Sequence, residues 1–107
     1  MNGPDILVVF AKPPIPGQCK ARLAAEIGAP AAAALAAAML QELAAQTALC
    51  PDLQVQLWYP PEADPAGFGQ LLPEAWPRRA QVGRDLGQRM DHCLQTLLRQ
   101  FPRGRVL

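Results

Sequence analysis

The stretch Ile6–Phe10 (ILVVF), followed directly by Ala11–Lys20 (AKPPIPGQCK), decides the fold of this chain. An unbroken run of aliphatic and aromatic residues predicts a strand that is buried on both faces, as in a parallel sheet. The ten residues that follow include three prolines and a glycine. They can form neither a helix nor a central strand. A constrained loop therefore follows the first strand.

Two helices are predicted beyond this loop. A short helix is expected over about Lys20–Ile27, with Gly28 as its C-terminal stop. Pro30 is then expected as the first residue of a second helix that reaches about Leu49. Its many alanines give that helix a high intrinsic propensity. One of its faces carries large apolar residues at every fourth position: Leu35, Met39 and Leu43.

A second strand and a third helix are predicted in the remaining half. Apolar and polar residues alternate over Leu53–Trp58 (LQVQLW), as in a strand. The segment Tyr59–Pro77 is rich in Pro and Gly and reads as loop, with a turn of helix at Phe68–Leu72. Asp85 followed by Gln88 fits a capping box that opens the last helix. The apolar arc of that helix follows the 3.6-residue period: Leu86, Met90, Cys93, Leu94, Leu97 and Phe101.

The order of these elements predicts an α/β fold, a parallel sheet with helical crossovers. The 107 residues allow one domain. A further strand starts at Arg105–Leu107, but two good strands make a small sheet for three helices. We therefore expect residues 1–107 to be a single, incomplete domain from the first part of a longer, truncated protein. An open sheet edge of this kind favours self-association.

Composition and charge exclude several classes of protein. No apolar run reaches the 18 or so residues of a membrane span, and no signal-peptide pattern opens the chain. Three widely spaced cysteines form neither a disulfide framework nor a zinc site, so the expected location is the cytoplasm. The pI near 7.7 argues against a nucleic-acid binder. Basic residues fall into two compact blocks, 12–22 and 78–105, which suit a small anion better.

The chemistry is expected in the loop Ala11–Lys20. Ligands of open parallel sheets bind beyond the carboxyl ends of the strands, where this loop lies. Lys12, Lys20 and Arg22 bring three positive charges to the start of the following helix, whose free N–H groups also favour an anion. Gly17 permits a positive φ or a close backbone approach. The same residues also suit a rigid turn with solvated lysines. The residue types alone leave both interpretations open, an anion site and a structural turn.

The order of residues in two segments resembles a known family. The strings LVVFAKPPIPGQCKARL (residues 7–23) and QVGRDLGQRMDHCL (residues 81–94) resemble its two signatures. These have the forms FAKxPxPGxxKTRL, after a strand, and QxxGDLGxRM, at the start of a later helix. The family is that of the bacterial DUF2064-type glycosyltransferases, GT-A-like members of the nucleotide-diphospho-sugar transferase superfamily. The resemblance implies a Rossmann-like GT-A fold and a nucleotide-diphospho-sugar as donor substrate.

Site residues follow from the resemblance by position. Those of the first motif would lie at the nucleotide diphosphate: Ala11, Lys12, Gly17, Lys20 and Arg22. Those of the second motif would lie close to the nucleotide: Asp85, Gly87 and Arg89. Each has a plainer alternative. Asp85 can simply cap its helix, and Arg89 can be solvated, whereas a glycine in a first helical turn hints at a close approach.

The chain also departs from the family pattern. Ala21 stands where the family has threonine, and Arg84 stands where it has the glycine before DLG. The family continues to a GSDxP-like segment, whose aspartate is expected to bind Mg²⁺ or Mn²⁺. That segment does not occur among these residues, so the family's metal is expected but its ligands are not present, and no catalytic residue is assigned.

Three functions from different classes stay open at this point. The first is a glycosyltransferase of which this chain carries the nucleotide-binding half and which is inactive alone. The second is a nucleotide- or phosphate-binding module without turnover. The third is a nucleotidyltransferase relative that shares the first loop.

Overall fold

The computed structural model describes residues 3–107 and shows one four-stranded parallel sheet between helices. The sheet order is β3-β2-β1-β4. This confirms the predicted α/β fold with helical crossovers. In chain order the elements are β1 (Asp5–Phe10), α1 (Ala21–Ile27), α2 (Ala29–Thr47), β2 (Leu53–Tyr59), the 3-10 helix η1 (Pro65–Phe68), β3 (Arg78–Ala80), α3 (Leu86–Gln100) and β4 (Arg105–Val106).

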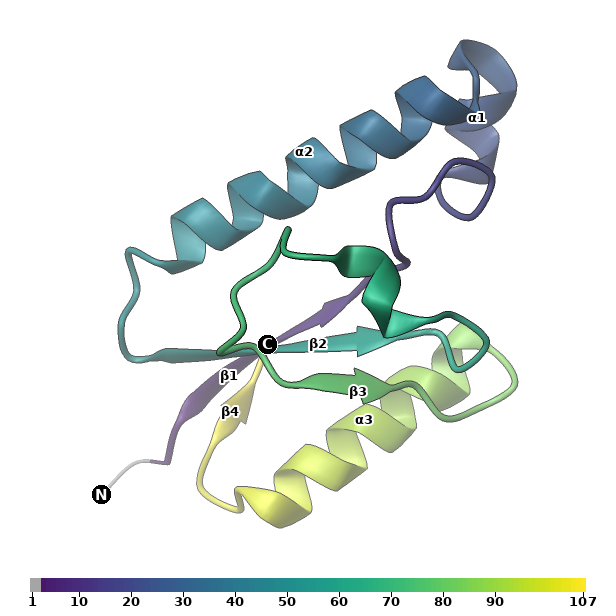
Figure 1. Ribbon diagram of the computed structural model, residues 1–107. Coiled ribbons are helices and arrows are strands. Elements are labelled where there is room, and N and C mark those ends of the chain that lie inside the picture. Colours follow the sequence, from purple (N-terminus) through teal and green to yellow (C-terminus); the bar gives the residue numbers. More distant parts are fainter. Residues whose placement is uncertain (1–2) are drawn as a thin grey trace.

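The helices cover the two faces of the sheet in separate layers (Figure 1). On the α2 face, Val9, Val55 and Leu57 pack with Phe68 and Trp76 in one core cluster. A second core cluster lies on the α3 face and consists of Ile6, Trp58, Cys93 and Leu97. The central strands therefore bury side chains on both faces, as the unbroken apolar run of β1 predicts.

The strand β1 is the centre of the sheet. It pairs with β2 from Asp5 opposite Leu53 to Phe10 opposite Trp58. On its other side Ile6 pairs with Val106 of β4. The strand start predicted at 105–107 is thus confirmed as a parallel partner of β1.

The boundaries of the first two helices follow their glycine and proline signals. Gly28 has φ +92° and serves both as the C-cap of α1 and as the N-cap of α2. The helix α2 begins at Ala29, one residue earlier than predicted, so Pro30 is its second residue instead of its first. The predicted stop and start are therefore confirmed to within one or two residues.

The face that α2 buries differs from the predicted stripe. Leu35 and Met39 are exposed. The helix instead buries small side chains, and Ala33 and Ala36 cluster with Cys19. Alanines let α1 and the loop before it approach α2 closely, which the spacing of large residues does not reveal.

Three further local features differ from the sequence predictions or lie beyond them. The turn of helix expected at Phe68–Leu72 lies earlier, in η1. The strand β3 follows the predicted loop Tyr59–Pro77, and no element is predicted there, since its residues RRA carry no strand signal of their own. In β2 the polar residue Gln56 is buried, because its Oε1 accepts a hydrogen bond from Trp58 Nε1 at 3.0 Å. Tertiary contacts decide all three positions.

The amphipathic helix α3 confirms its predicted cap and only part of its apolar arc. Asp85 Oδ1 accepts from Gln88 N at 2.8 Å, and Gln88 Oε1 accepts from Arg84 N at 2.9 Å. Cys93 and Leu97 are buried under the sheet, and burial raises the pKa of the Cys93 thiol to about 11. Four large residues on one flank are exposed: Leu86, Met90, Leu94 and Leu98.

An ion pair holds β4 to the start of β1. Arg105 Nε and Nη2 donate to the two carboxylate oxygens of Asp5 at 2.8 and 2.9 Å. These hydrogen bonds lower the pKa of Asp5 below its ordinary 3.8. A carboxyl group whose pKa is lowered by folding adds stability above its unfolded pKa, and this stability disappears as the pH falls through the folded pKa.

Replacing Asp5 by Asn is therefore expected to lower the urea midpoint slightly at neutral pH, since the pair is exposed. The gap between wild type and variant should close as the pH falls below 3.8. Urea unfolding of both proteins at neutral pH and at about pH 2.5 measures this. A gap of equal size at both pH values would contradict a charge-based role for Asp5.

Candidate nucleotide site at the carboxyl edge of the sheet

Three parallel strands end at one edge of the sheet, at Phe10, Tyr59 and Ala80. The loop Ala11–Lys20 leaves this edge and leads to α1 (Figure 1). Its first residue stays attached to the sheet, because Ala11 N donates to Trp58 O at 3.2 Å. The predicted position of the loop at the carboxyl edge is confirmed.

The middle of the loop is a tight turn over residues 15–18. Gln18 N donates to Ile15 O at 2.9 Å, and Gly17 has φ +84°. Proline at the second position and glycine with positive φ at the third are typical of a type II turn. Pro16 and Gly17 therefore give this turn its shape at little conformational cost.

Lys20 has an unusual backbone conformation. Its φ is +51° and its ψ +49°, which makes it the one residue other than glycine with positive φ within 3–107. The left-handed region costs a side-chain-bearing residue about 1–2 kcal/mol. Strain of this kind is held in place by the surrounding structure and is often found at functional sites.

The 3-10 helix η1 braces the loop from the side. Pro13 is fully buried. A Cβ added at Gly67 would lie 2.7 Å from Ile15 Cδ1 and 2.8 Å from Pro13 Cβ. Such distances are shorter than van der Waals contact, so only glycine allows η1 to pack this closely on the loop. The sequence analysis did not single out Gly67, because its partner lies more than fifty residues earlier.

A cavity of about 890 Å³ opens beside the loop. Its walls are largely apolar and include Val9 of β1 and Met39, Leu40 and Leu43 of α2. Cationic side chains line the same cavity and are exposed: Lys12, Lys20 and Arg22. An apolar interior with a few converging charged groups is the usual composition of a small-molecule site.

The structure brings most of the first motif together. Ala11, Lys12, Lys20 and Arg22 all line this cavity. Gly17 lies outside the lining and shapes the turn. The helix α1 has only seven residues and no side-chain cap. Positive charge at this site therefore comes from the side chains rather than from the end of a long helix.

The predicted site residues of the second motif lie at the N-cap and in the first residues of α3, outside the lining of this cavity. Asp85 caps α3. Gly87 is in the first turn, where an added Cβ would meet only Asp85 Oδ1, at 3.4 Å, so packing within the described chain does not require glycine there. The residue that does require it is Gly83, with φ +140° and a Cβ position 2.8 Å from Arg89 N.

Arg89 connects two loops at the carboxyl edge. Its Nε donates to Gly83 O at 3.0 Å, and Nη2 lies 3.7 Å from Glu62 Oε2. Glu62 belongs to the loop after β2. Arg89 is thus neither purely solvated nor directed at the cavity, and it holds the loop before α3 in position.

Trp58 organises the same edge on the α3 face. The guanidinium carbon of Arg79 lies 4.8 Å from the centre of its ring system, and the Phe10 ring stacks at 6.5 Å. Gln81 Nε2 donates to Trp58 O at 2.8 Å. A cation over an indole contributes about 0.5–2 kcal/mol. These contacts hold the ends of β1, β2 and β3 together, and no short-range sequence signal reveals them.

The donor set within 3–107 does not fit a resident metal. No three His, Cys, Asp or Glu side chains gather there. The carboxylate of Asp85, at the second motif, is engaged in its helix cap. We therefore derive no step through a metal.

No helix within residues 3–107 has the length and apolarity to cross a membrane.

Comparison with known proteins adds one structural relative. No protein-family model matches the chain, and no curated protein sequence matches it. A crystal structure described as a "putative nucleotide-diphospho-sugar transferase" from Desulfovibrio desulfuricans G20 is similar, with a TM-score of 0.67 and 29% identity. The match covers 90% of this chain and 42% of that one, so this chain spans less than half the length of that protein.

The parallel sheet, its helical layers and the loop after β1 form a Rossmann-like α/β fold, consistent with the fold of a nucleotide-diphospho-sugar transferase.

The contact between η1 and the loop gives a test of how the site is held. Replacing Gly67 by Ala should push Pro13 and Ile15 aside, lower the free energy of unfolding by about 1–3 kcal/mol, and shift the loop amide resonances. Gly69 is the matched control, because it has φ +54° and no atom within 4 Å of an added Cβ.

Gly69→Ala is expected to cost about 1–3 kcal/mol of backbone strain, because its φ of +54° and ψ of −134° favour glycine, without moving the loop amides. Urea unfolding and ¹H–¹⁵N spectra measure both effects. Unchanged resonances of Ile15 and Gly17 in Gly67→Ala would show that η1 does not brace the loop.

Proposed function

We propose that this chain is the nucleotide-binding part of a nucleotide-diphospho-sugar glycosyltransferase of the DUF2064 kind. The loop Ala11–Lys20 and the cavity beside it would hold the nucleotide diphosphate of the donor. The observation that carries the proposal is the convergence of Lys12, Lys20 and Arg22 on one apolar cavity at the carboxyl end of β1.

This combination of charge and apolar surface suits a nucleotide. The diphosphate is a compact anion, and ammonium and guanidinium groups form strong charge-assisted hydrogen bonds with phosphate oxygens. A base or ribose is flatter and less polar, and aliphatic walls such as Val9 and Leu40 suit it. The alternative of a rigid turn with solvated lysines explains neither the apolar interior nor the shared cavity.

The reaction implied is transfer of the sugar from its diphosphate. The bond between the anomeric carbon and the diphosphate oxygen breaks, and negative charge grows on the leaving group. Cations positioned at that group stabilise the charge as it develops. Lys12, Lys20 and Arg22 would supply this stabilisation, and the strained backbone at Lys20 would hold its side chain in position.

The similar crystal structure supports the class of donor, since its title describes a nucleotide-diphospho-sugar transferase. Because this chain spans only 42% of that protein, the proposal gives it donor binding and assigns no acceptor.

The DUF2064 assignment rests on the two motifs at 7–23 and 81–94. Asp85, Gly87 and Arg89 are proposed to position the second nucleotide-proximal loop. A cytoplasmic location is proposed from the free thiols of Cys19, Cys50 and Cys93.

Alanine at Lys12, Lys20 or Arg22 is expected to weaken nucleotide diphosphate binding about tenfold, the worth of one hydrogen bond to a charged group. Alanine at Arg99 or Arg103 should leave binding unchanged, because these exposed arginines lie outside the cavity. Thermal-shift titrations with nucleoside diphosphates and nucleotide sugars measure this. Equal losses in all five variants would indicate non-specific electrostatics and overturn the site.

Ligand preference in these titrations, together with product analysis of the same mixtures, separates the three functional classes. Tighter binding of a nucleotide sugar than of inorganic pyrophosphate supports the donor-binding part of a glycosyltransferase. Pyrophosphate release from a nucleoside triphosphate would instead indicate a nucleotidyltransferase. Binding that does not distinguish a nucleotide sugar from inorganic pyrophosphate would indicate a phosphate-binding module.

A further inference from the structure

A second cavity lies on the α2 face, at the end of the sheet where β2 begins. It has a volume of about 470 Å³ and is walled by the C-terminal end of α2, the first half of β2 and the segment 73–77. It shares no lining residue with the cationic cavity. Along α2, the cationic cavity is lined by residues between 36 and 43 and the second cavity by residues between 44 and 48, so the two cavities adjoin successive stretches of one helix.

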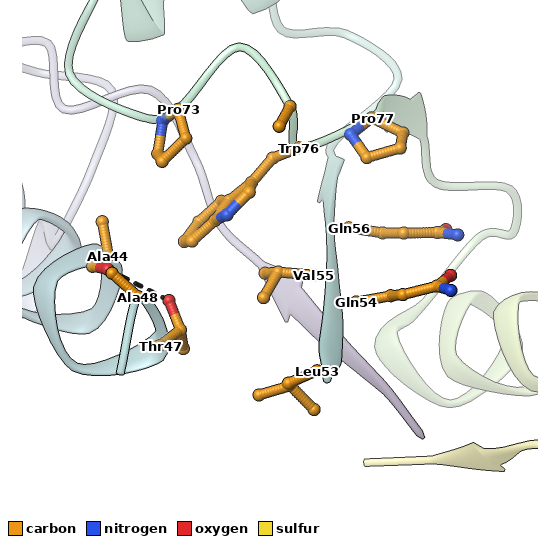
Figure 2. A pocket seen from close by; sticks show the side chains of 11 residues that line it. Ala44, Thr47, Ala48, Leu53, Gln54, Val55, Gln56, Pro73, Trp76 and Pro77 are labelled. Atoms are coloured by element: carbon orange, nitrogen blue, oxygen red, sulfur yellow. Dashed lines mark hydrogen bonds between the residues drawn. The ribbon is translucent and has the colours of Figure 1, made fainter. Parts of the chain in front are cut away.

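The interior of this second cavity is apolar. Figure 2 shows Leu53, Val55 and Trp76 facing it, whereas Gln54 and Gln56 extend from the other side of β2. Gln56 is engaged on that other face, where it accepts the indole proton of Trp58. Apolar walls and a volume within the usual range of about 300–1,000 Å³ suit a small organic molecule.

One hydrogen-bond donor is directed into this apolar space. Trp76 is 6% exposed, and its indole nitrogen faces the cavity (Figure 2). Within residues 3–107 no acceptor bonds to Trp76 Nε1, in contrast to Trp58 Nε1. No fully sealed side-chain nitrogen or oxygen in that range lacks a partner, so the Trp76 N–H keeps some exposure to solvent. A nearly buried indole N–H usually finds an acceptor.

The charge of the occupant follows from the neighbouring helix end. The C-terminal end of α2, a helix of 19 residues, forms one wall, and Thr47 Oγ1 donates to Ala44 O at 3.2 Å there (Figure 2). A helix C-terminus carries partial negative charge and disfavours an anion. The Arg78 guanidinium also lies beside the cavity, where it donates to Pro73 O at 3.4 Å and to Trp76 O at 3.1 Å and is engaged with these carbonyls. A carboxylate in the cavity would lose its hydration against apolar walls, at a high cost. A neutral acceptor therefore fits the Trp76 N–H better than a carboxylate does.

We propose that this second cavity binds a small neutral molecule with an aromatic or alicyclic body and one carbonyl oxygen, which accepts the Trp76 indole proton. The apolar walls take up the body of the ligand. The indole N–H fixes its orientation and gives the site its preference for a carbonyl compound over a hydrocarbon. This site is independent of the nucleotide cavity and of the proposed transferase activity.

Acetophenone is a probe with these features, and ethylbenzene is its counterpart without an acceptor. The chain has two tryptophans, so its ¹H–¹⁵N spectrum has two indole resonances. Trp76→Phe identifies the resonance of Trp76 by removing it. Acetophenone is expected to shift that resonance and not that of Trp58. It should bind about three- to tenfold more tightly than ethylbenzene, the worth of one neutral hydrogen bond.

Three controls make the test decisive. In Trp76→Phe, the preference for acetophenone should disappear. Leu94→Ala, an exposed apolar change on the other face, should leave binding unchanged. Benzoate should bind more weakly than acetophenone.

Equal affinity for acetophenone and ethylbenzene, no shift of the Trp76 resonance, or tighter binding of benzoate would each overturn the proposal. If Trp76→Phe does not fold, the comparison of the three probes on the unmodified chain decides.

Discussion

Parallel pairing of β1 with β2 is the constraint on which the rest of the structure depends. Six residue pairs, from Asp5 with Leu53 to Phe10 with Trp58, keep the strands in register. Parallel strands end at the same edge, so the segments that follow them must begin side by side. Both faces of such a pair need cover, which α2 and α3 provide from opposite sides (Figure 1). The position of the cationic cavity is thus a consequence of strand direction.

Contacts within the chain fix the shape of the loop after β1. A type II turn at 15–18 fixes its middle, and Pro13 is buried beneath η1. Rigidity of this kind lowers the entropy that a ligand loses on binding. Lys20, at the end of the same loop, has a left-handed conformation, at a cost of about 1–2 kcal/mol. That strain is consistent with a loop whose geometry serves binding.

Local signals in the sequence were enough to predict the elements but not the way they are held together. The run Ile6–Phe10, the glycine at 28 and the Asp85 cap each act within a few residues, and the structure confirms all three. The strand β3 could not be predicted, because Arg78–Ala80 becomes a strand only through its pairing with β2. For the site, the loop and its cations were predicted from position and resemblance. The brace at Gly67 and the Trp58 cluster join distant segments, and no pattern along the chain contains them.

The central claim is that a preformed cationic loop at the carboxyl end of β1 binds a diphosphate. A titration with inorganic pyrophosphate, followed by ¹H–¹⁵N spectra of the unmodified chain, tests it most directly. The account predicts saturable shifts that are largest at the amides of residues 11–23 and negligible at the arginine-bearing end of α3. Shifts spread evenly over both basic blocks, or no saturable shift at the loop, would contradict it.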